Sequence, residues 1–214
     1  MRITRTPSAL LAATLLVALA AVAAVAQQPA AADNGAAKSS PEGKAAAAPA
    51  PAASAAPKVG DPAPDFKLPY ATAEKIFFRP DEHMSLSGLR GKTVVLAFYP
   101  ADWSSGCTTE VCTFRDSFAD LGKLNAVILG ISGDYVFSHH EWAKHHKLTF
   151  PLLSDHDHKV AKMYDSYMEQ YGLNKRTIFV IDKDGVVRYS NLAFKAGDKK
   201  EYDALRAEIE KLNK

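Results

Sequence analysis

The stretch Phe98-Tyr-Pro-Ala-Asp-Trp-Ser-Ser-Gly-Cys-Thr-Thr-Glu-Val-Cys112 holds both cysteines of the chain, Cys107 and Cys112. The apolar run at residues 93–99 leads into it. This run is short, rich in β-branched and aromatic residues, and ended by Pro100, so it predicts a buried strand. After the glycine at 106, apolar residues recur at spacings of three and four, which predicts a helix over about residues 107–124.

Cys107 is therefore expected where a strand passes into the first turn of a helix. Unpaired backbone N–H groups and the positive end of the helix dipole meet at such a position. They favour a thiolate, which is the nucleophilic form of cysteine. The simpler interpretation is that both cysteines are small buried core residues.

The first residues have the pattern of an export signal. Arg2 and Arg5 precede an apolar run at residues 9–25, and Ala24-Val-Ala26 offers a small-x-small cleavage site. This predicts a signal peptide over residues 1–26 and an exported, periplasmic protein. An uncleaved membrane anchor is the alternative, although the run is near the lower length limit for a span.

Residues 27–57 contain 14 Ala and 5 Pro among 31 residues, with no aromatic residue and no Val, Ile or Leu. Such a segment has too little apolar surface to offset its ordering entropy, so it predicts a disordered linker. Residues 58–214 are long enough for one domain with a single core. The chain carries a net charge of +2, and without the two leader arginines it is about neutral. This balance argues against nucleic-acid partners.

The order of elements in residues 58–214 predicts an α/β fold. Further strands are expected at residues 125–132, 151–153 and 176–181, the last with a hairpin partner at 186–190, and further helices at residues 135–146, 159–166 and 201–212. Strands that alternate with helices predict a central mixed β-sheet flanked by helices.

The spacing of the two cysteines argues against a static disulfide. Positions i and i+5 of a regular helix lie about 8.7 Å apart between Cα atoms, whereas a disulfide tolerates at most about 7 Å. Cys107 and Cys112 can therefore bond only if the start of the helix unwinds. A bridge that requires a rearrangement suggests a redox cycle.

The chain resembles the peroxiredoxins, most closely the subgroup of bacterioferritin comigratory protein and peroxiredoxin Q. The family signature Pro-x-x-x-Thr/Ser-x-x-Cys matches Pro100-Ala-Asp-Trp-Ser-Ser-Gly-Cys107, and the subgroup's second cysteine matches Cys112, with Thr-x-Glu between the two. A family arginine matches Arg176 in Arg-Thr-Ile-Phe-Val-Ile-Asp182. The resemblance covers about residues 58–210 and implies a thioredoxin-like fold.

The resemblance also implies roles. Cys107 is the peroxidatic thiol that reduces a hydroperoxide, and Cys112 is the resolving thiol that closes an intramolecular disulfide. Arg176 stabilises the thiolate and polarises the peroxide. The other site residues expected are Ser104, which hydrogen-bonds the sulfur, Pro100, which shields it, Gly106, whose N–H faces the substrate, Trp103, which lines the pocket or caps the core, and Glu110, most simply a first-turn carboxylate that favours the helix dipole.

The implied partners are a peroxide, a thioredoxin-like reductant and, at most, a second copy in a weak dimer. No cofactor, metal, nucleic acid or membrane is expected for the mature protein. The paired histidines His139-His140 and His145-His146, and His156-x-His158, are expected to be solvated, because their spacing is not that of a helical ligand pair.

Two features depart from the subgroup. Ser105 replaces the usual proline before the Gly-Cys pair, and residues 70–83 are longer than the usual link, so they are expected to cover or reshape the substrate opening.

Two rival functions remain on the same fold. A thiol–disulfide reductase normally uses Cys-x-x-Cys, and a copper-delivery protein needs Cys-x-x-x-Cys with a distal histidine. The spacing in this chain fits neither.

Overall fold

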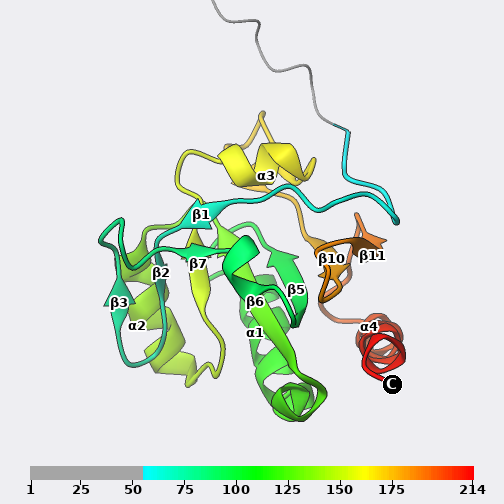
Figure 1. The fold of residues 1–214 in the computed structure, drawn as a ribbon. Coiled ribbons are helices and arrows are strands. Elements are labelled where there is room, and N and C mark those ends of the chain that lie inside the picture. The colour runs from blue at the N-terminus through cyan, green and yellow to red at the C-terminus, as the bar shows by residue number, and fades with distance from the viewer. Residues whose placement is uncertain (1–54) are drawn as a thin grey trace, which may run out of the picture. The chain divides into compact units, whose positions relative to one another are not determined.

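A seven-stranded mixed sheet, with strands in the order β11-β10-β5-β6-β7-β2-β3, forms the centre of the fold. The computed structural model describes residues 55–214 (Figure 1). The predicted leader, residues 1–26, and nearly all of the predicted linker, residues 27–57, lie outside the described residues.

The elements have the following bounds. The strands of the central sheet are β2 (Tyr70–Ala71), β3 (Ile76–Phe77), β5 (Thr93–Phe98), β6 (Ala126–Ser132), β7 (Leu152–Ser154), β10 (Thr177–Ile181) and β11 (Val187–Asn191). Two small sheets pair β1 (Lys67–Leu68) with β4 (Met84–Ser85) and β8 (Tyr167–Met168) with β9 (Leu173–Asn174). The helices are α1 (Ser105–Ser117), α2 (Val136–His146), α3 (Lys159–Met163) and α4 (Lys199–Leu212), with 3₁₀ turns η1 (Ser87–Leu89) and η2 (Leu121–Leu124).

The pairing of strands makes the sheet mixed. β5 and β6 run parallel, as do β6 and β7. The helix α1 lies between β5 and β6 in the chain, and α2 between β6 and β7, and each returns the chain to the end of the sheet at which the previous strand began. β10 runs antiparallel to both β5 and β11, and β2 runs antiparallel to both β7 and β3. The predicted α/β class with a central mixed sheet flanked by helices is confirmed.

Both faces of the sheet are buried, which explains why every residue of β5 is buried. Val95 and Ala97 point to the face covered by α1, α2 and α4, where Phe114, Trp142 and Leu205 join the core. The alternate residues Val94, Leu96 and Phe98 point to the opposite face, which α3 and the residues around β1 cover. Figure 1 shows α3 on one side of the sheet and α1 and α4 on the other.

The helix after β5 is shorter than the sequence predicts. α1 ends at Ser117, and the chain then makes the 3₁₀ turn η2 around Gly122. This turn still brings Leu121 into the same core cluster as Phe118. Apolar residues at helical spacing therefore continue in the sequence beyond the residue at which the helix ends. Between residues 55 and 214, no helix is both long and apolar enough to cross a bilayer.

The longer segment at residues 70–83 forms the hairpin β2–β3 at the edge of the central sheet. It packs beside α2, where His140 Nδ1 lies 2.9 Å from the carbonyl oxygen of Thr72. The segment extends the sheet and contributes no hydrogen bond to either cysteine. That this segment covers or reshapes the substrate opening stays a prediction.

Candidate functional site

Cys107 is the third residue of α1 and is completely buried. The first helical hydrogen bond runs from the N–H of Thr108 to the carbonyl oxygen of Ser104, at 2.9 Å. The N–H groups of Gly106 and Cys107 therefore precede the first intrahelical bond and have no acceptor within the helix. They offer donors and a positive dipole end to an anion beside the sulfur.

Arg176 contacts the sulfur from the neighbouring strand. It directly precedes β10, whose first residue, Thr177, pairs with Phe98 at the end of β5. This register brings the two chain segments together, and Arg176 Nη2 lies 3.4 Å from Cys107 Sγ. A Cβ atom on Gly106 would lie 3.3 Å from the same Nη2. Glycine at 106 thus leaves room for the guanidinium above the start of the helix.

Glu110 is the second partner of Arg176. Its Oε2 accepts a hydrogen bond from Nη1, so one guanidinium joins the carboxylate to the sulfur. Burial opposes the charged form of Arg176, but Glu110 and the Cys107 sulfur outweigh burial and raise the pKa of the guanidinium above its usual value.

The environment of Glu110 corrects the role predicted for it. The side chain is completely buried, and α1 begins at Ser105, so Glu110 lies past the first turn of the helix. Burial raises the pKa of its carboxyl to about 7, against the opposing effect of Arg176. Its second oxygen, Oε1, has no hydrogen-bond partner among the described residues. The carboxyl therefore holds a proton more readily than an ordinary glutamate does.

The loop before α1 carries the other predicted residues. Pro100 is half-buried beside the end of β5. Ser104 is the N-cap residue of α1, but its hydroxyl donates to the carbonyl oxygen of Ala101 at 3.1 Å and not to the sulfur. The predicted bond between Ser104 and Cys107 is thus not formed here. Trp103 is 53% exposed, so it does not cap the core.

Cys112 lies five residues further along α1 and is half-buried. Both cysteines are free and belong to one continuous helix, as the sequence predicts. A bond between them requires the helix to unwind between residues 107 and 112.

A buried polar network beneath the loop was missed by the sequence analysis. Asp102 accepts from Tyr99 Oη at 2.8 Å and from Ser138 Oγ at 2.7 Å, and its Oδ2 lies 2.9 Å from His139 Nδ1. His139 Nε2 lies 3.1 Å from the carbonyl oxygen of Leu153. The expectation that His139 is solvated is wrong, because the side chain is completely buried.

The spacing of the residues around His139 could have indicated from the sequence that this histidine is buried. Val136, His139 and Ala143 recur at three and four residues, which places His139 on the buried face of α2. The other members of the histidine pairs are at least partly exposed. Within residues 55–214, no group of three or more His, Cys, Asp and Glu side chains is arranged to hold a metal ion.

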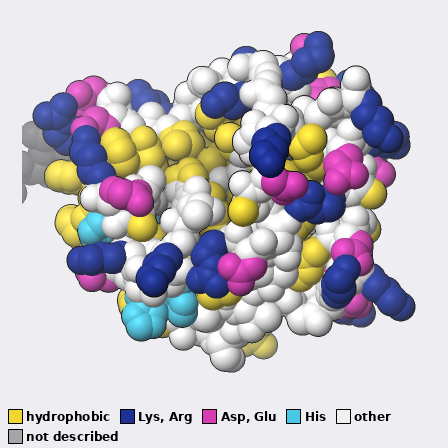
Figure 2. Space-filling view, turned by 90° about the horizontal axis from the view of Figure 1, so that it is seen from below, with side chains coloured by type: hydrophobic (Ala, Val, Ile, Leu, Met, Phe, Trp, Pro, Cys, Tyr) yellow, Lys and Arg dark blue, Asp and Glu magenta, His cyan; other side chains and the backbone are white. Residues whose placement is uncertain are grey.

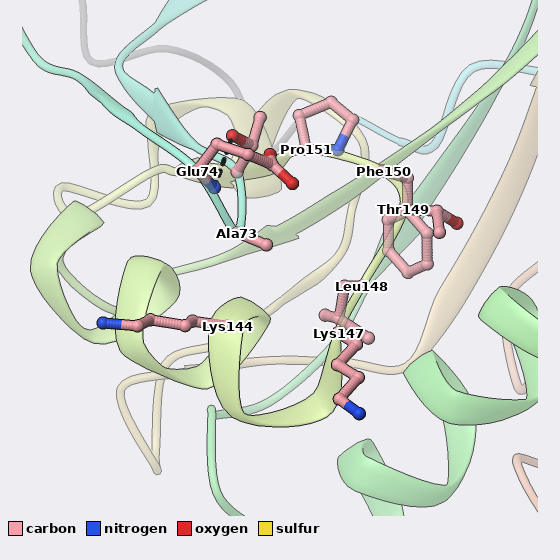
Figure 3. Close-up of a pocket in the computed structure, with 9 residues that line it drawn as sticks. Ala73, Glu74, Lys144, Lys147, Leu148, Thr149, Phe150 and Pro151 are labelled. Atoms are coloured by element: carbon pink, nitrogen blue, oxygen red, sulfur yellow. Dashed lines mark hydrogen bonds between the residues drawn. The ribbon is translucent and has the colours of Figure 1, made fainter.

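A pocket of about 330 Å³ lies between the 72–74 segment and the end of α2 (Figure 3). Its lining includes Glu74, Lys144, Phe150 and Pro151. In Figure 3 the side chains of Lys144 and Lys147 extend outward from the helix end, and Glu74 lies across the opening from them. Neither cysteine lines this pocket.

The face of the molecule in Figure 2 shows Lys and Arg interspersed with Asp and Glu. No extended area of one charge is visible on this face. This pattern agrees with the small net charge of the chain.

Comparison with known proteins gives a consistent family. The model described as "AhpC/TSA family" matches residues 59–190. Peroxiredoxin Bcp of Bacillus subtilis (strain 168) is 38% identical over 134 residues, which are 60% of this chain and 80% of that protein. The chloroplastic peroxiredoxin Q of Oryza sativa subsp. japonica is 47% identical over 107 residues, 50% of this chain and 49% of that protein. The chain thus spans about half the length of this relative.

A solved structure agrees with the sequence relatives. The crystal structure of peroxidoxin BcpB from Mycobacterium tuberculosis has a TM-score of 0.63 and 32% sequence identity, and the match covers 74% of this chain and 99% of that chain. The thioredoxin-like arrangement and the subgroup expected from the cysteine motif are confirmed.

Proposed function

The chain belongs to the AhpC/TSA family, and on this premise we propose that it is a thiol peroxidase that reduces hydrogen peroxide and organic hydroperoxides to water and alcohols. The observation that carries the proposal is the contact of 3.4 Å between Arg176 Nη2 and Cys107 Sγ at a helix N-terminus with free N–H groups. A thiolate and an oxyanion both gain from this combination of charge and donors.

In the proposed reaction the Cys107 thiolate attacks one peroxide oxygen. An S–O bond forms, the O–O bond breaks, and the second oxygen leaves as hydroxide or alkoxide and takes a proton from solvent. Arg176 and the N–H groups of Gly106 and Cys107 stabilise the charge that develops on the leaving oxygen. Pro100 excludes water from one side of the sulfur. Ser104 turns its hydroxyl from Ala101 towards the peroxide when the substrate enters.

Cys112 then resolves the sulfenic acid on Cys107. Helix α1 unwinds locally, the Cys112 sulfur attacks the Cys107 sulfur, an S–S bond forms, the S–O bond breaks, and water is released. A thioredoxin-like protein returns both thiols to the reduced state by exchange. We propose that the protein works as a monomer or weak dimer.

We also propose that the chain is exported to the periplasm. The support is the sequence pattern of Arg2, Arg5 and the apolar run before Ala26. Export predicts a mature protein that begins at Gln27, and N-terminal sequencing of the protein purified from its native host tests this. An intact Met1 terminus would contradict cleavage.

The family and the names of the relatives favour a peroxidase over a thiol–disulfide reductase or a copper-delivery protein. A peroxide-consumption assay with dithiothreitol as reductant tests the choice, with wild type and Cys107→Ser side by side. We expect consumption by wild type and none above background by Cys107→Ser. Equal consumption by both would refute the proposal, and insulin reduction and copper titration of the same samples would then distinguish the two rivals.

A further inference from the structure

Cys112 has a partner of its own outside the Cys107–Arg176 site. Its Sγ lies 3.7 Å from Nδ1 of His146, the last residue of α2. Both side chains are partly exposed. A thiol and an imidazole at this separation form a pair in which a proton can pass from sulfur to nitrogen.

Arg115 holds this pair together. Its Nη1 donates to the carbonyl oxygen of His146 at 2.5 Å, and this contact fixes the end of α2 against α1. A hydrogen bond to Asp116 is the main reason that the pKa of Arg115 is raised, and the Cys112 sulfur adds to the effect. Arg115 thus lies beside both members of the pair.

His146 is suited to accept a proton. Partial burial lowers its pKa, and the neighbouring His145 and Arg115 lower it further. The neutral imidazole, which is the form that accepts a proton, is therefore favoured. The charged or titratable groups that face it are Cys112 and Arg115 from α1 and His145 from its own helix.

Two tryptophan rings lie next to His146. The Trp142 ring lies edge-on at 5.9 Å between centroids, and the exposed Trp103 ring lies at 6.4 Å. The loop that carries Trp103 comes directly before Ser104 and the Cys107 turn. The pair is thus next to the segment that must move when the disulfide closes.

We propose that His146 is the general base of the resolving step. This inference rests on the proposed peroxidase function. His146 Nδ1 takes the proton from Cys112 Sγ, and the thiolate so formed attacks the Cys107 sulfur. The S–S bond forms as the S–O bond of the sulfenic acid breaks, and the hydroxide that leaves is protonated to water, by His146 or by solvent. The sum is one sulfenic acid and one thiol converted to one disulfide and one water.

The reactivity of Cys112 can be measured without the peroxidase cycle. In a Cys107→Ser background, Cys112 is the only thiol, and its alkylation by iodoacetamide is followed by mass spectrometry from pH 5.5 to 9. We expect His146→Asn to lower the rate at pH 7 by about tenfold and to remove an inflection below pH 7 that comes from protonation of the imidazole. The matched control is His145→Asn, which removes the neighbouring exposed imidazole, and we expect it to change the rate by less than about twofold.

The cycle itself is the second readout. With both cysteines present, His146→Asn is expected to slow disulfide closure after peroxide addition by about tenfold, and His145→Asn is not. Equal alkylation rates and pH profiles in the His146→Asn and parent proteins would overturn the inference, even if the protein is a peroxidase. A His146-dependent alkylation profile in a protein that does not react with peroxide would instead refute the proposed function and leave the Cys112–His146 pair intact.

Discussion

Substitution of Glu110 by glutamine tests the physical account of the site. The carboxyl is completely buried, and burial raises its pKa from 4.5 to about 7. Because it binds a proton more tightly in the folded than in the unfolded chain, the folded state holds more protons between about pH 4.5 and 7. The free energy of unfolding must therefore fall as the pH rises through this interval.

The magnitude follows from the pKa. At roughly 1.4 kcal/mol per pH unit, ionisation of Glu110 removes about 2–3 kcal/mol of stability between pH 5 and pH 8. Glutamine does not titrate, and its Oε1 keeps an acceptor for Arg176. The stability of Glu110→Gln relative to its parent should therefore increase by about 2–3 kcal/mol over the same interval.

Urea unfolding at pH 5, 6, 7 and 8 measures this difference, with Cys107→Ser as the parent so that the peroxidatic thiol does not contribute. The matched control is Glu169→Gln, which removes an exposed carboxylate and is expected to show no trend with pH. A difference between Glu110→Gln and its parent that stays constant from pH 5 to 8 would refute the buried, protonated carboxyl.

Two further substitutions test neighbouring parts of the structure. Arg176→Lys keeps the positive charge but loses the forked guanidinium that joins Glu110 to Cys107. The rate constant for peroxide reduction, measured by stopped flow, should therefore fall by about 100-fold. A rate constant near that of wild type would show that the positive charge alone suffices. Asp102→Asn leaves His139 without its buried carboxylate partner and should lower the free energy of unfolding in urea by about 3 kcal/mol. Asp116→Asn, at an exposed ion pair, should leave the free energy of unfolding nearly unchanged.

The main strands could be predicted because each one is a short apolar run of chain that packs on both faces. β5 and β10 are buried throughout. Each is therefore an unbroken, mainly apolar run of sequence, which can be recognised without knowing which strands lie beside it. The two-residue strands β2 and β3 could not be predicted. They are too short for a periodic pattern, and the pairing of Tyr70 with Leu153 depends on residues far away in the sequence.

The candidate site likewise has parts that the local sequence predicts and parts that it does not. The cysteine positions and the helix start are local and follow from the sequence around Cys107. The partner of Glu110 lies 66 residues away, so a local reading assigns this glutamate to the helix dipole. Its spacing of three from Cys107 does place it on the same side of α1, which would have indicated a buried position. The Cys112–His146 contact likewise joins two helices and has no local signal.

In the proposed cycle Cys107 reacts with peroxide, and Cys112 then resolves the sulfenic acid. Stopped-flow tryptophan fluorescence tests both steps, because Trp103 and Trp142 both lie against His146, the partner of Cys112. Reduced protein is mixed with hydrogen peroxide. We expect two phases in wild type with a mass loss of two hydrogens per chain, only the first phase in Cys112→Ser, and no response in Cys107→Ser. A wild-type protein that reacts no faster than free cysteine at the same pH would contradict it.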